Sequence, residues 1–243
     1  MTDPLDYLDD EILPRDTLYS VTVDGLASTL YWAENGGVDH SSAIVELRIV
    51  PANEASWGDI EAIFGTADYP FHCQCQRFKV TGWIWRDTSL SERLAMHRAG
   101  TACETPDAPH TSGLVAYLGN EPVGWVAVEP RVAYPKLRGQ RVPWSGRHED
   151  KNDAGVWAVT CFCVRKGYRG QGITYALAQA AAEHARAQGA TAVEGYSIIT
   201  EPGVEITWGE THVGARQVFE EAGFEEVTAP TKRRRVMRID FSS

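Results

Sequence analysis

The segment from residue 155 to residue 189 constrains the fold of this 243-residue chain most strongly. It begins with GVWAVTCFCV, whose β-branched and aromatic side chains favour a strand. A basic, glycine-containing loop, RKGYRGQG, follows, and ITYALAQAAAEHARAQ then places apolar residues at helical spacing up to Gly189. A strand, a glycine loop and a helix in this order predict an anion site at the loop. The expected buried face of the helix consists of Ile173, Leu177, Ala180, Ala181 and His184.

The other segments mix strands and helices, which predicts an α/β or mixed α+β fold. Ser56 stands where a helix N-cap is expected, and Ser91 is expected to cap a second helix. Gly119-Asn120 is a tight-turn pair between two apolar runs, so it predicts a β-hairpin. Residues 130–154 form a long connection, a feature that in compact domains is more often functional than idle. Further strands are expected at 43–50, 191–198 and 232–241, and a late helix at 211–224.

The negative charge of the chain is concentrated at its N-terminal end. The first forty residues hold nine acidic residues and one arginine, which is −8 of a total of −10 and leaves −2 for the remainder. A nearly neutral body has no broad basic field for duplex nucleic acid, so no nucleic-acid partner is expected. Asp24-Gly25 predicts a hairpin within residues 17–32. We therefore predict an acidic N-terminal extension at 1–40 and a main domain at 41–243, with the hairpin as a surface for a homodimer.

Several other classes of protein are disfavoured by composition. No apolar run reaches the length of a membrane span, and the first thirty residues lack a signal-peptide pattern. A cytoplasmic protein without a membrane partner is therefore expected. The five cysteines are an odd number, which favours reduced thiols. A cluster of His72, Cys73, Cys75 and Cys103 matches no standard zinc spacing, so no metal is expected.

The loop before the predicted helix has the properties of a diphosphate site. Free N–H groups of a first helical turn and the positive end of the helix dipole attract anions. Gly170 and Gly172 allow the backbone to approach a bulky anion, and Arg165, Lys166 and Arg169 add positive charge. The competing interpretation is a surface loop whose basic side chains are only solvated.

Two known phosphate-binding designs fit this loop poorly. A P-loop needs a Lys followed by Ser or Thr after its second glycine, whereas Ile173 and Thr174 follow Gly172. The dinucleotide fingerprint needs a third glycine where Tyr175 stands. Glu194 lies about twenty residues downstream, where a ribose-binding acid could sit. A dinucleotide-dependent enzyme therefore remains a minor alternative.

The third design fits best, because VRKGYRGQGIT resembles the pyrophosphate loop of the GCN5-related N-acetyltransferase (GNAT) superfamily. The family pattern has Arg or Gln, two residues, Gly, one residue, then Gly or Ala, and this chain departs from it at Thr174. EPVGWVAV and HVGARQVFEEAGF resemble the central hairpin strand and the late helix of the family, and the resemblance covers roughly residues 42–241. It implies a central mixed, splayed sheet flanked by helices, with acyl-CoA between two parallel strands. The implied cofactor-binding residues are Phe162, Cys163, Val164, Arg169, Gly170, Gln171, Gly172, Ile173 and Thr174.

The resemblance also implies where the catalytic groups lie. The family's proton donor is often a Tyr in the late helix, and Phe219, which cannot donate a proton, stands at that position. His212 is the substitute donor in this interpretation, with Thr211 or Tyr196 as other options, against the alternative that His212 is an exposed first-turn histidine. Glu129, at the end of the neighbouring strand, is the first choice for a base, against the alternative of a strand-end surface acid. Glu194 is the second choice.

The implied activity is an acyl-CoA-dependent N-acyltransferase that transfers acetyl from acetyl-CoA to an amine by direct attack in a ternary complex. The acceptor is a small-molecule or peptide amine, and an aromatic group near residues 69–86 is expected to line its pocket or to form a separate hydrophobic cluster. The replacement at Phe219 motivates the alternative of a non-catalytic acyl-CoA-binding or interaction module. The aromatic group consists of Tyr69, Phe71, Trp83 and Trp85.

Overall fold

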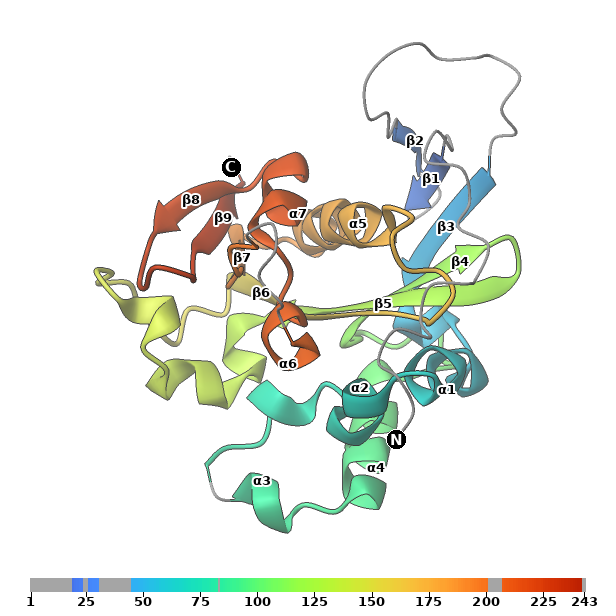
Figure 1. Cartoon of the computed structure of the whole chain (residues 1–243), viewed down its shortest axis with the longest axis horizontal. Coiled ribbons are helices and arrows are strands. Elements are labelled where there is room, and N and C mark those ends of the chain that lie inside the picture. Colours follow the sequence, from blue (N-terminus) through green and yellow to red (C-terminus); the bar gives the residue numbers. More distant parts are fainter. Residues whose placement is uncertain (1–18, 24–25, 31–44, 83, 201–206, 242–243) are drawn as a thin grey trace, which may run out of the picture.

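The computed structural model describes residues 19–23, 26–30, 45–82, 84–200 and 207–241. Within these residues the fold is a mixed nine-stranded sheet in the order β2-β1-β3-β4-β5-β6-β7-β9-β8 (Figure 1). The strands are β1 (Tyr19–Val23), β2 (Leu26–Leu30), β3 (Val45–Pro51), β4 (Gly113–Leu118), β5 (Glu121–Pro130), β6 (Val156–Val164), β7 (Ala192–Gly195), β8 (Glu225–Thr228) and β9 (Val236–Asp240). The helices are α1 (Trp57–Gly65), α2 (Asp68–Cys73), α3 (Ile84–Asp87), α4 (Leu90–Thr101), α5 (Ile173–Ala187), α6 (Trp208–Thr211) and α7 (Arg216–Glu221).

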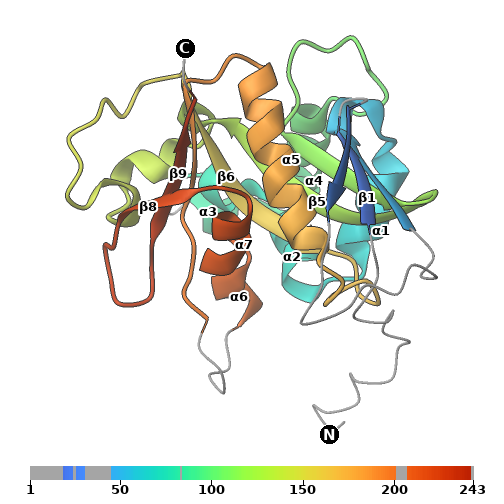
Figure 2. The same cartoon turned by 90° about the horizontal axis from the view of Figure 1, so that it is seen from above.

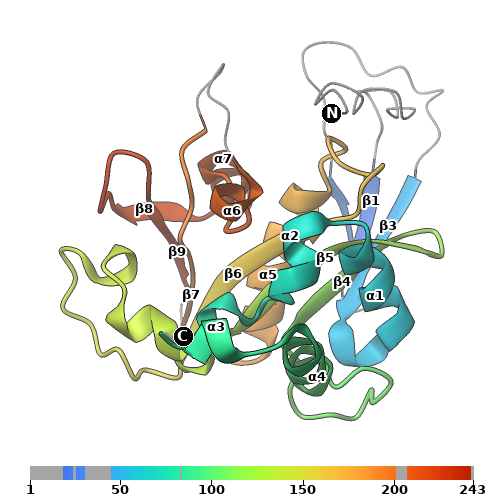
Figure 3. The same cartoon turned by 60° about the horizontal axis from the view of Figure 1, so that its bottom comes forward.

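Helices cover the two faces of the sheet, as the sequence predicts for a mixed α/β fold. α5 runs across one face with α7 beside it, and α1, α2 and α4 lie on the other face (Figures 2 and 3). β3 to β6 pair antiparallel, whereas β1 with β3 and β6 with β7 pair parallel. The core is therefore divided by β4, β5 and β6 into an α5 layer and an α1 layer.

α5 confirms the predicted helix in its bounds and in its buried face. Ile173, Leu177, Ala180, Ala181 and His184 are all buried. The helix lies close to β5, because a Cβ added at Gly124 would come within 2.9 Å of the Ile173 side chain and 3.1 Å of Leu177. Its apolar stripe thus anchors α5 on the sheet, and this fixes the position of the loop at its N-terminus.

Both predicted N-caps lie close to real helix starts, but one of them is displaced. Ser56 caps α1 through a reciprocal pair of bonds with Asp59, as expected. α4 is capped by Ser89 and not by Ser91, so that prediction is wrong by two residues. Ser89 is favoured because Glu92, three residues later, accepts a bond from its backbone N–H at 2.7 Å.

The hairpin predicted around Asp24-Gly25 is confirmed for its strands, since β1 and β2 pair antiparallel. β1 also pairs parallel with β3, so this hairpin extends the sheet and lies at its edge. The domain boundary near residue 41 falls outside the described residues and stays a prediction. No helix in the described part of the chain is long and apolar enough to cross a membrane.

β6 and β7 separate part-way along their length, as the resemblance implies. Pairing runs from Val156 opposite Ala192 to Val159 opposite Gly195 and then stops, while β6 continues to Val164. On its other side β6 carries a β-bulge, because Ala127 pairs with Cys161 and Val128 with Val159, which leaves Thr160 as the extra residue. The splay and the bulge therefore lie at the same level of the sheet, next to Val159 and Thr160.

Candidate functional site

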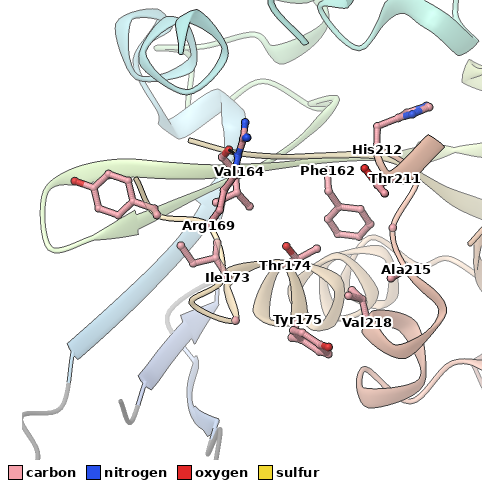
Figure 4. Close-up of a pocket in the computed structure, with 14 residues that line it drawn as sticks. Phe162, Val164, Arg169, Ile173, Thr174, Tyr175, Thr211, His212, Ala215 and Val218 are labelled. Carbon is pink, nitrogen blue, oxygen red and sulfur yellow. Dashed lines mark hydrogen bonds between the residues drawn. The ribbon is translucent and has the colours of Figure 1, made fainter. Parts of the chain in front are cut away.

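A cavity of about 330 Å³ lies where β6 and β7 diverge (Figure 4). Its walls come from the outer half of β6, the glycine loop, the first turn of α5 and the loop before α7. The residues that line it include Phe162, Val164, Arg169, Gly170, Gly172, Ile173, Thr174, His212, Ala215 and Val218. The cavity therefore gathers most of the predicted cofactor residues, and we refer to it as the cleft.

The glycine loop presents backbone N–H groups to the cleft. Gly170 and Gly172 both have a φ of +75°, and a Cβ at either position would meet no atom within 4 Å. Gly172 is the N-cap of α5, so the N–H groups of Ile173 and Thr174 belong to the first helical turn. α5 is fifteen residues long, and its dipole makes the N-terminus attractive to an anion.

Arg169 and Gln171 are held within the loop by its own carbonyl groups. Arg169 Nε donates to the Val164 carbonyl at 3.1 Å, and Gln171 Nε2 donates to the Gly167 carbonyl at 3.3 Å. Arg169 lines the cleft, whereas Gln171 is absent from its walls. The predicted role of Gln171 is therefore indirect at most in this arrangement, through the shape of the loop.

The edge of β6 that faces the cleft is apolar in its side chains and polar in its backbone. The Phe162 ring points toward the start of α5 (Figure 4). The Phe162 N–H donates to the His212 carbonyl at 2.7 Å. The predicted residue Cys163 packs with Cys161 on the opposite face, so only its backbone can serve the cleft.

The buried cysteines lack the properties of nucleophiles. Contact with the Cys75 thiol, together with burial, raises the pKa of Cys161 well above its ordinary value. Burial alone is the main cause of the raised pKa of Cys163. A thiol with a raised pKa is a poor nucleophile, so these two side chains serve the packing of the α1 layer.

The backbone and the ring of His212 make contacts on different sides of β6. It lies between α6 and α7, its carbonyl accepts the Phe162 N–H, and its ring points away from α5 (Figure 4). The ring stacks on Phe78 with centroids 6.1 Å apart, and the residue is 5% exposed. The alternative of an exposed first-turn histidine is therefore wrong.

Phe219 is wholly buried and apolar in its surroundings. Its ring meets the edges of Phe162 and Phe224 with centroids 5.8 and 5.1 Å away. A Cβ at Gly195 would lie 2.2 Å from this ring, and one at Gly214 would lie 2.7 Å from it. At the position where the family often has a tyrosine, this chain therefore has a phenylalanine that packs in the core.

Glu129 lies outside the cleft, on the face of the sheet opposite α5. Its carboxylate is 2.5 Å from Lys79 Nζ and is 15% exposed. Burial raises the pKa of Glu129, while Lys79 and the Tyr134 hydroxyl act in the opposite direction. Glu129 also borders a second cavity of about 890 Å³, which shares no residue with the cleft.

The two predicted catalytic residues thus do not line one cavity, but one short segment contacts both. Phe78 stacks on the His212 ring, and the next residue, Lys79, pairs with Glu129. Both side chains therefore lie on the same face of β6. Lys79 was missed in the sequence because a lone lysine in an irregular segment carries no signal of its partner.

Glu194, the second-choice base and the candidate ribose-binding acid, is locked in an ionic cluster. It is fully buried, and Arg131 and Arg238 bind its Oε1 at 2.8 and 2.6 Å. Arg147 Nη1 and the Tyr196 hydroxyl both donate to Oε2 at 3.1 Å. Both carboxylate oxygens accept hydrogen bonds from these partners, so Glu194 is available neither as a base nor for a ribose. The dinucleotide alternative therefore lacks its ribose-binding acid.

The predicted aromatic acceptor pocket is not assembled at the cleft. Tyr69 is 38% exposed and accepts a bond from Arg77 at 2.6 Å. The guanidinium of Arg93 covers the Trp85 ring at 4.8 Å, and Trp83 lies outside the described residues. As for a metal, the described His, Cys, Asp and Glu side chains include no group of three or more that could bind one.

Comparisons with known proteins identify the family. A model of the acetyltransferase (GNAT) family matches residues 78–198, which include the central hairpin, β6, the glycine loop, α5 and β7. This chain belongs to the GNAT family, whose members generally use acetyl-CoA as the acyl donor. A search of curated protein sequences finds no match.

A search of solved structures finds similar chains of low sequence identity. A GCN5-related N-acetyltransferase from Kribbella flavida is 17% identical, with 80% of this chain and 98% of that chain covered and a TM-score of 0.46. An N-acetyltransferase from Staphylococcus aureus Mu50 is 13% identical, with 80% and 98% covered and a TM-score of 0.46. A further acetyltransferase is 19% identical, with 77% and 97% covered and a TM-score of 0.47.

Proposed function

We propose that this protein transfers the acetyl group of acetyl-CoA to an amine by direct attack within a ternary complex. The observation that carries the proposal is the cleft at the N-terminus of α5, where two glycines of positive φ and the first helical turn present N–H groups beside the splayed edge of β6. This arrangement suits a ligand with a diphosphate at one end and amide groups along its length.

We assign different residues of the cleft to different parts of the acetyl-CoA donor. We assign the diphosphate to the loop from Arg169 to Thr174, and the pantetheine arm to the backbone of Phe162, Cys163 and Val164. The arm then replaces the His212 carbonyl at the Phe162 N–H. The apolar walls from Phe162 and Val218 exclude water from the thioester, which favours aminolysis over hydrolysis.

The chemistry needs a base for the ammonium form of the acceptor and a proton for the departing thiolate. Glu129 is assigned as the base, because burial raises the pKa of its carboxyl above the ordinary value while Lys79 acts in the opposite direction. His212 is assigned as the proton donor, since Phe219 cannot fill that role. The acceptor, a small-molecule or peptide amine, approaches from the face opposite α5, where the Glu129 carboxylate and the His212 ring lie.

A two-stage experiment tests the proposal. Titration calorimetry with acetyl-CoA, CoA and NAD compares binding, and release of the CoA thiol is then followed against a panel of amines. We expect binding of both CoA species and amine-dependent thiol release. Binding of NAD without CoA would favour a dinucleotide enzyme instead.

A second candidate is a non-catalytic acyl-CoA-binding module. The buried Phe219 ring favours it, because the proton donor of the family position is absent. CoA binding without thiol release on any amine of the panel would select this candidate.

A further inference from the structure

The turn that follows α2 has an unusual backbone conformation. Gln74 and Cys75 have φ values of +49° and +52°, so two successive residues with side chains lie in the left-handed region. Non-glycine residues rarely adopt this conformation, and it persists only where surrounding contacts enforce it. The short 3-10 turn η2 (Gln76–Phe78) begins directly after it. Backbone strain of this kind collects at functional sites, so the contacts of this turn bear on function.

A buried histidine of α4 holds the turn in place. His97 Nδ1 lies 3.0 Å from Gln74 Oε1, and both residues are 1% exposed. The Gln74 amide nitrogen donates to the Phe71 carbonyl at 2.7 Å, so the amide oxygen faces the imidazole and accepts from Nδ1. Gln76 Nε2 donates in turn to the Gln74 carbonyl at 3.0 Å. These bonds fix the backbone from the end of α2 to the start of η2.

The His97 ring is itself held rigidly among aromatic side chains. Its centroid lies 4.9 Å from that of Phe64, 5.0 Å from that of Trp125 and 5.7 Å from that of Trp57, each ring meeting it edge to face. Burial lowers the pKa of His97 to about 3, and the charge of Lys79 acts in the same direction. The imidazole is therefore neutral near pH 7, and this anchor does not change with pH in that range.

Two consecutive side chains of the anchored turn reach the two residues assigned to proton transfer. The Phe78 ring stacks on the His212 ring with an interplanar angle of 29° and centroids 6.1 Å apart. Lys79 Nζ lies 2.5 Å from Glu129 Oε2. The Lys79 N–H donates to the Gln76 carbonyl at 3.0 Å, which closes the turn behind both side chains.

α4 also lies directly against the ammonium group of Lys79. A Cβ added at Gly100 would be 3.5 Å from Lys79 Nζ, so the ammonium packs on the helix where the helix has no side chain. The same group lies 5.7 Å from the centre of the Tyr134 ring. The side chains of Lys79 and Glu129 are 19% and 15% exposed, so little water screens their attraction. These contacts restrict a side chain that is otherwise among the most flexible.

We propose that the turn at residues 74–79, anchored on α4 by His97, is the positioning element of the site. Within it, Lys79 fixes the carboxylate assigned as the base, and Phe78 orients the ring assigned as the proton donor. This inference rests on the proposed function. His97, Lys79 and Phe78 are positioning residues, because they act through the two assigned groups and neither take nor give a proton themselves.

Loss of the Lys79 charge has a defined effect on the pH dependence. Among the described residues, the charged and titratable groups that act on Glu129 are Lys79 and the Tyr134 hydroxyl, and both favour its ionised form. A nearby cation lowers the pKa of a carboxyl, so removal of the cation leaves the pKa of Glu129 higher. A base must be ionised to accept a proton. The acidic limb of the pH–rate profile therefore moves to higher pH when the charge is removed.

Lys79→Met tests this effect, because it removes the charge and keeps the length of the side chain. We expect kcat near neutral pH to fall about tenfold, the acidic limb to move upward and the KM for acetyl-CoA to stay unchanged. Lys79→Arg keeps the charge and should restore the position of the limb. Lys151→Met is the control, because Lys151 Nζ also lies over an aromatic ring, that of Trp144 at 5.0 Å, and donates to a carbonyl. An unmoved limb in a folded Lys79→Met variant would overturn the proposal.

The anchor is tested by a double-mutant cycle. His97→Leu removes the donor to Gln74, whereas His97→Asn keeps an N–H group near the position of Nδ1. We expect His97→Leu to move the acidic limb upward and His97→Asn to leave it in place. If His97 acts through Lys79, His97→Leu adds no further displacement in the Lys79→Met background, and full additivity would reject the anchor. Gln74→Met breaks the same bond from the other side and should reproduce the displacement if His97→Leu does not fold.

Phe78 is tested by two variants that differ in the ring. Phe78→Tyr keeps an aromatic ring for stacking on His212, and Phe78→Leu does not. We expect Phe78→Leu to lower kcat without moving the acidic limb, because Glu129 and Lys79 are unaltered, and Phe78→Tyr to keep kcat. Equal kcat in a folded Phe78→Leu variant and the unaltered enzyme would reject this role of Phe78.

A titration without turnover separates this inference from the proposed function. Carbon-13 NMR of labelled glutamate follows Glu129, which is assigned by the signal that Glu129→Gln lacks. Lys79→Met is expected to raise the pKa of Glu129, and Lys151→Met to leave it in place. A raised pKa in a protein that transfers no acetyl group would support the control of Glu129 by Lys79 and reject the activity. An unchanged pKa in an active enzyme would reject the positioning role alone.

Discussion

The two faces of β6 are built for different tasks. On the α5 face, the cleft offers backbone N–H groups, two positive-φ glycines and apolar side chains, with Arg169 as its basic contact. On the opposite face lie the buried titratable groups Tyr134 and Glu194 and the half-buried Glu129. One face offers main-chain N–H groups at a cavity, and the other gathers charged side chains.

In the proposed function, this difference lets one strand serve two substrates. The bulge leaves Cys161 on the face opposite α5, and Phe162, three residues after Val159, therefore faces α5 as Val159 does. Binding of the donor then depends on backbone that few substitutions alter, whereas the chemistry depends on side chains that can vary. Variants on one face should therefore spare the function of the other.

Glu129→Gln gives the largest expected effect. The amide cannot accept the acceptor's proton, so kcat is expected to fall about 10²- to 10⁴-fold, with the affinity for acetyl-CoA unchanged. Because burial raises the pKa of Glu129, the acidic limb in the unaltered enzyme lies above the ordinary range of a glutamate. The variant loses that limb in a thiol-release assay across pH.

Glu121→Gln is the control, because Glu121 lies at the other end of β5 and pairs with Arg165 at 2.9 Å. It should keep kcat. A similar loss in both variants would mean that carboxylates of β5 act on stability and not on proton transfer.

Glu194→Gln tests whether the buried charge on this face serves the fold. Loss of the carboxylate leaves Arg131, itself 1% exposed, without its buried partner, so the free energy of unfolding is expected to fall by about 3–5 kcal/mol. Urea unfolding measures it. Glu149→Gln removes a carboxylate that is 38% exposed in the same cluster, and a smaller loss is expected.

Gly170→Glu tests the cleft. The new carboxylate faces the proposed diphosphate, and like-charge repulsion is expected to weaken CoA about 100-fold in calorimetry. Gly189→Glu is matched to it, since Gly189 has a φ of +79° and equally open surroundings at the other end of α5. Undiminished affinity in a folded Gly170→Glu variant would refute the loop assignment.

Phe219→Tyr has the smallest expected effect on activity. The ring is clamped between Gly195 and Gly214, so a hydroxyl there is buried without a partner and destabilises the fold by about 1 kcal/mol or more. We expect no gain in kcat. A faster enzyme with a new limb at high pH would instead show that the family position still reaches the reacting atoms.

The sequence predicts well what depends on local pattern. The extent and buried face of α5, the glycines of its loop and the turn at Gly119-Asn120 each follow from neighbours in the chain, and the structure confirms these elements. The N-cap of α4 could also have been predicted correctly. A capping box needs Glu or Gln three residues after the cap; Glu92 stands there for Ser89, whereas Leu94 stands there for Ser91.

The rest depends on contacts between segments far apart in the chain. Arg131 and Arg147 come from the connection at 130–154, and their partner Glu194 comes from β7. The pairing of Glu129 with Lys79 crosses fifty residues, and the bulge at Thr160 appears only when β5 and β6 are placed in register. The spacing of residues along the sequence does not predict such long-range contacts.

The 2.7 Å bond from the Phe162 amide to the His212 carbonyl has an energetic consequence for ligand entry. A donor substrate that pairs with this amide exchanges one acceptor for another, so the number of hydrogen bonds at this position stays constant. The net gain from the exchange is small, and most of the affinity must come from the anion end of the ligand. In the proposed ternary complex, the same exchange would free the peptide that carries the His212 ring, so binding of the donor would change the position of a side chain assigned to the acceptor's reaction.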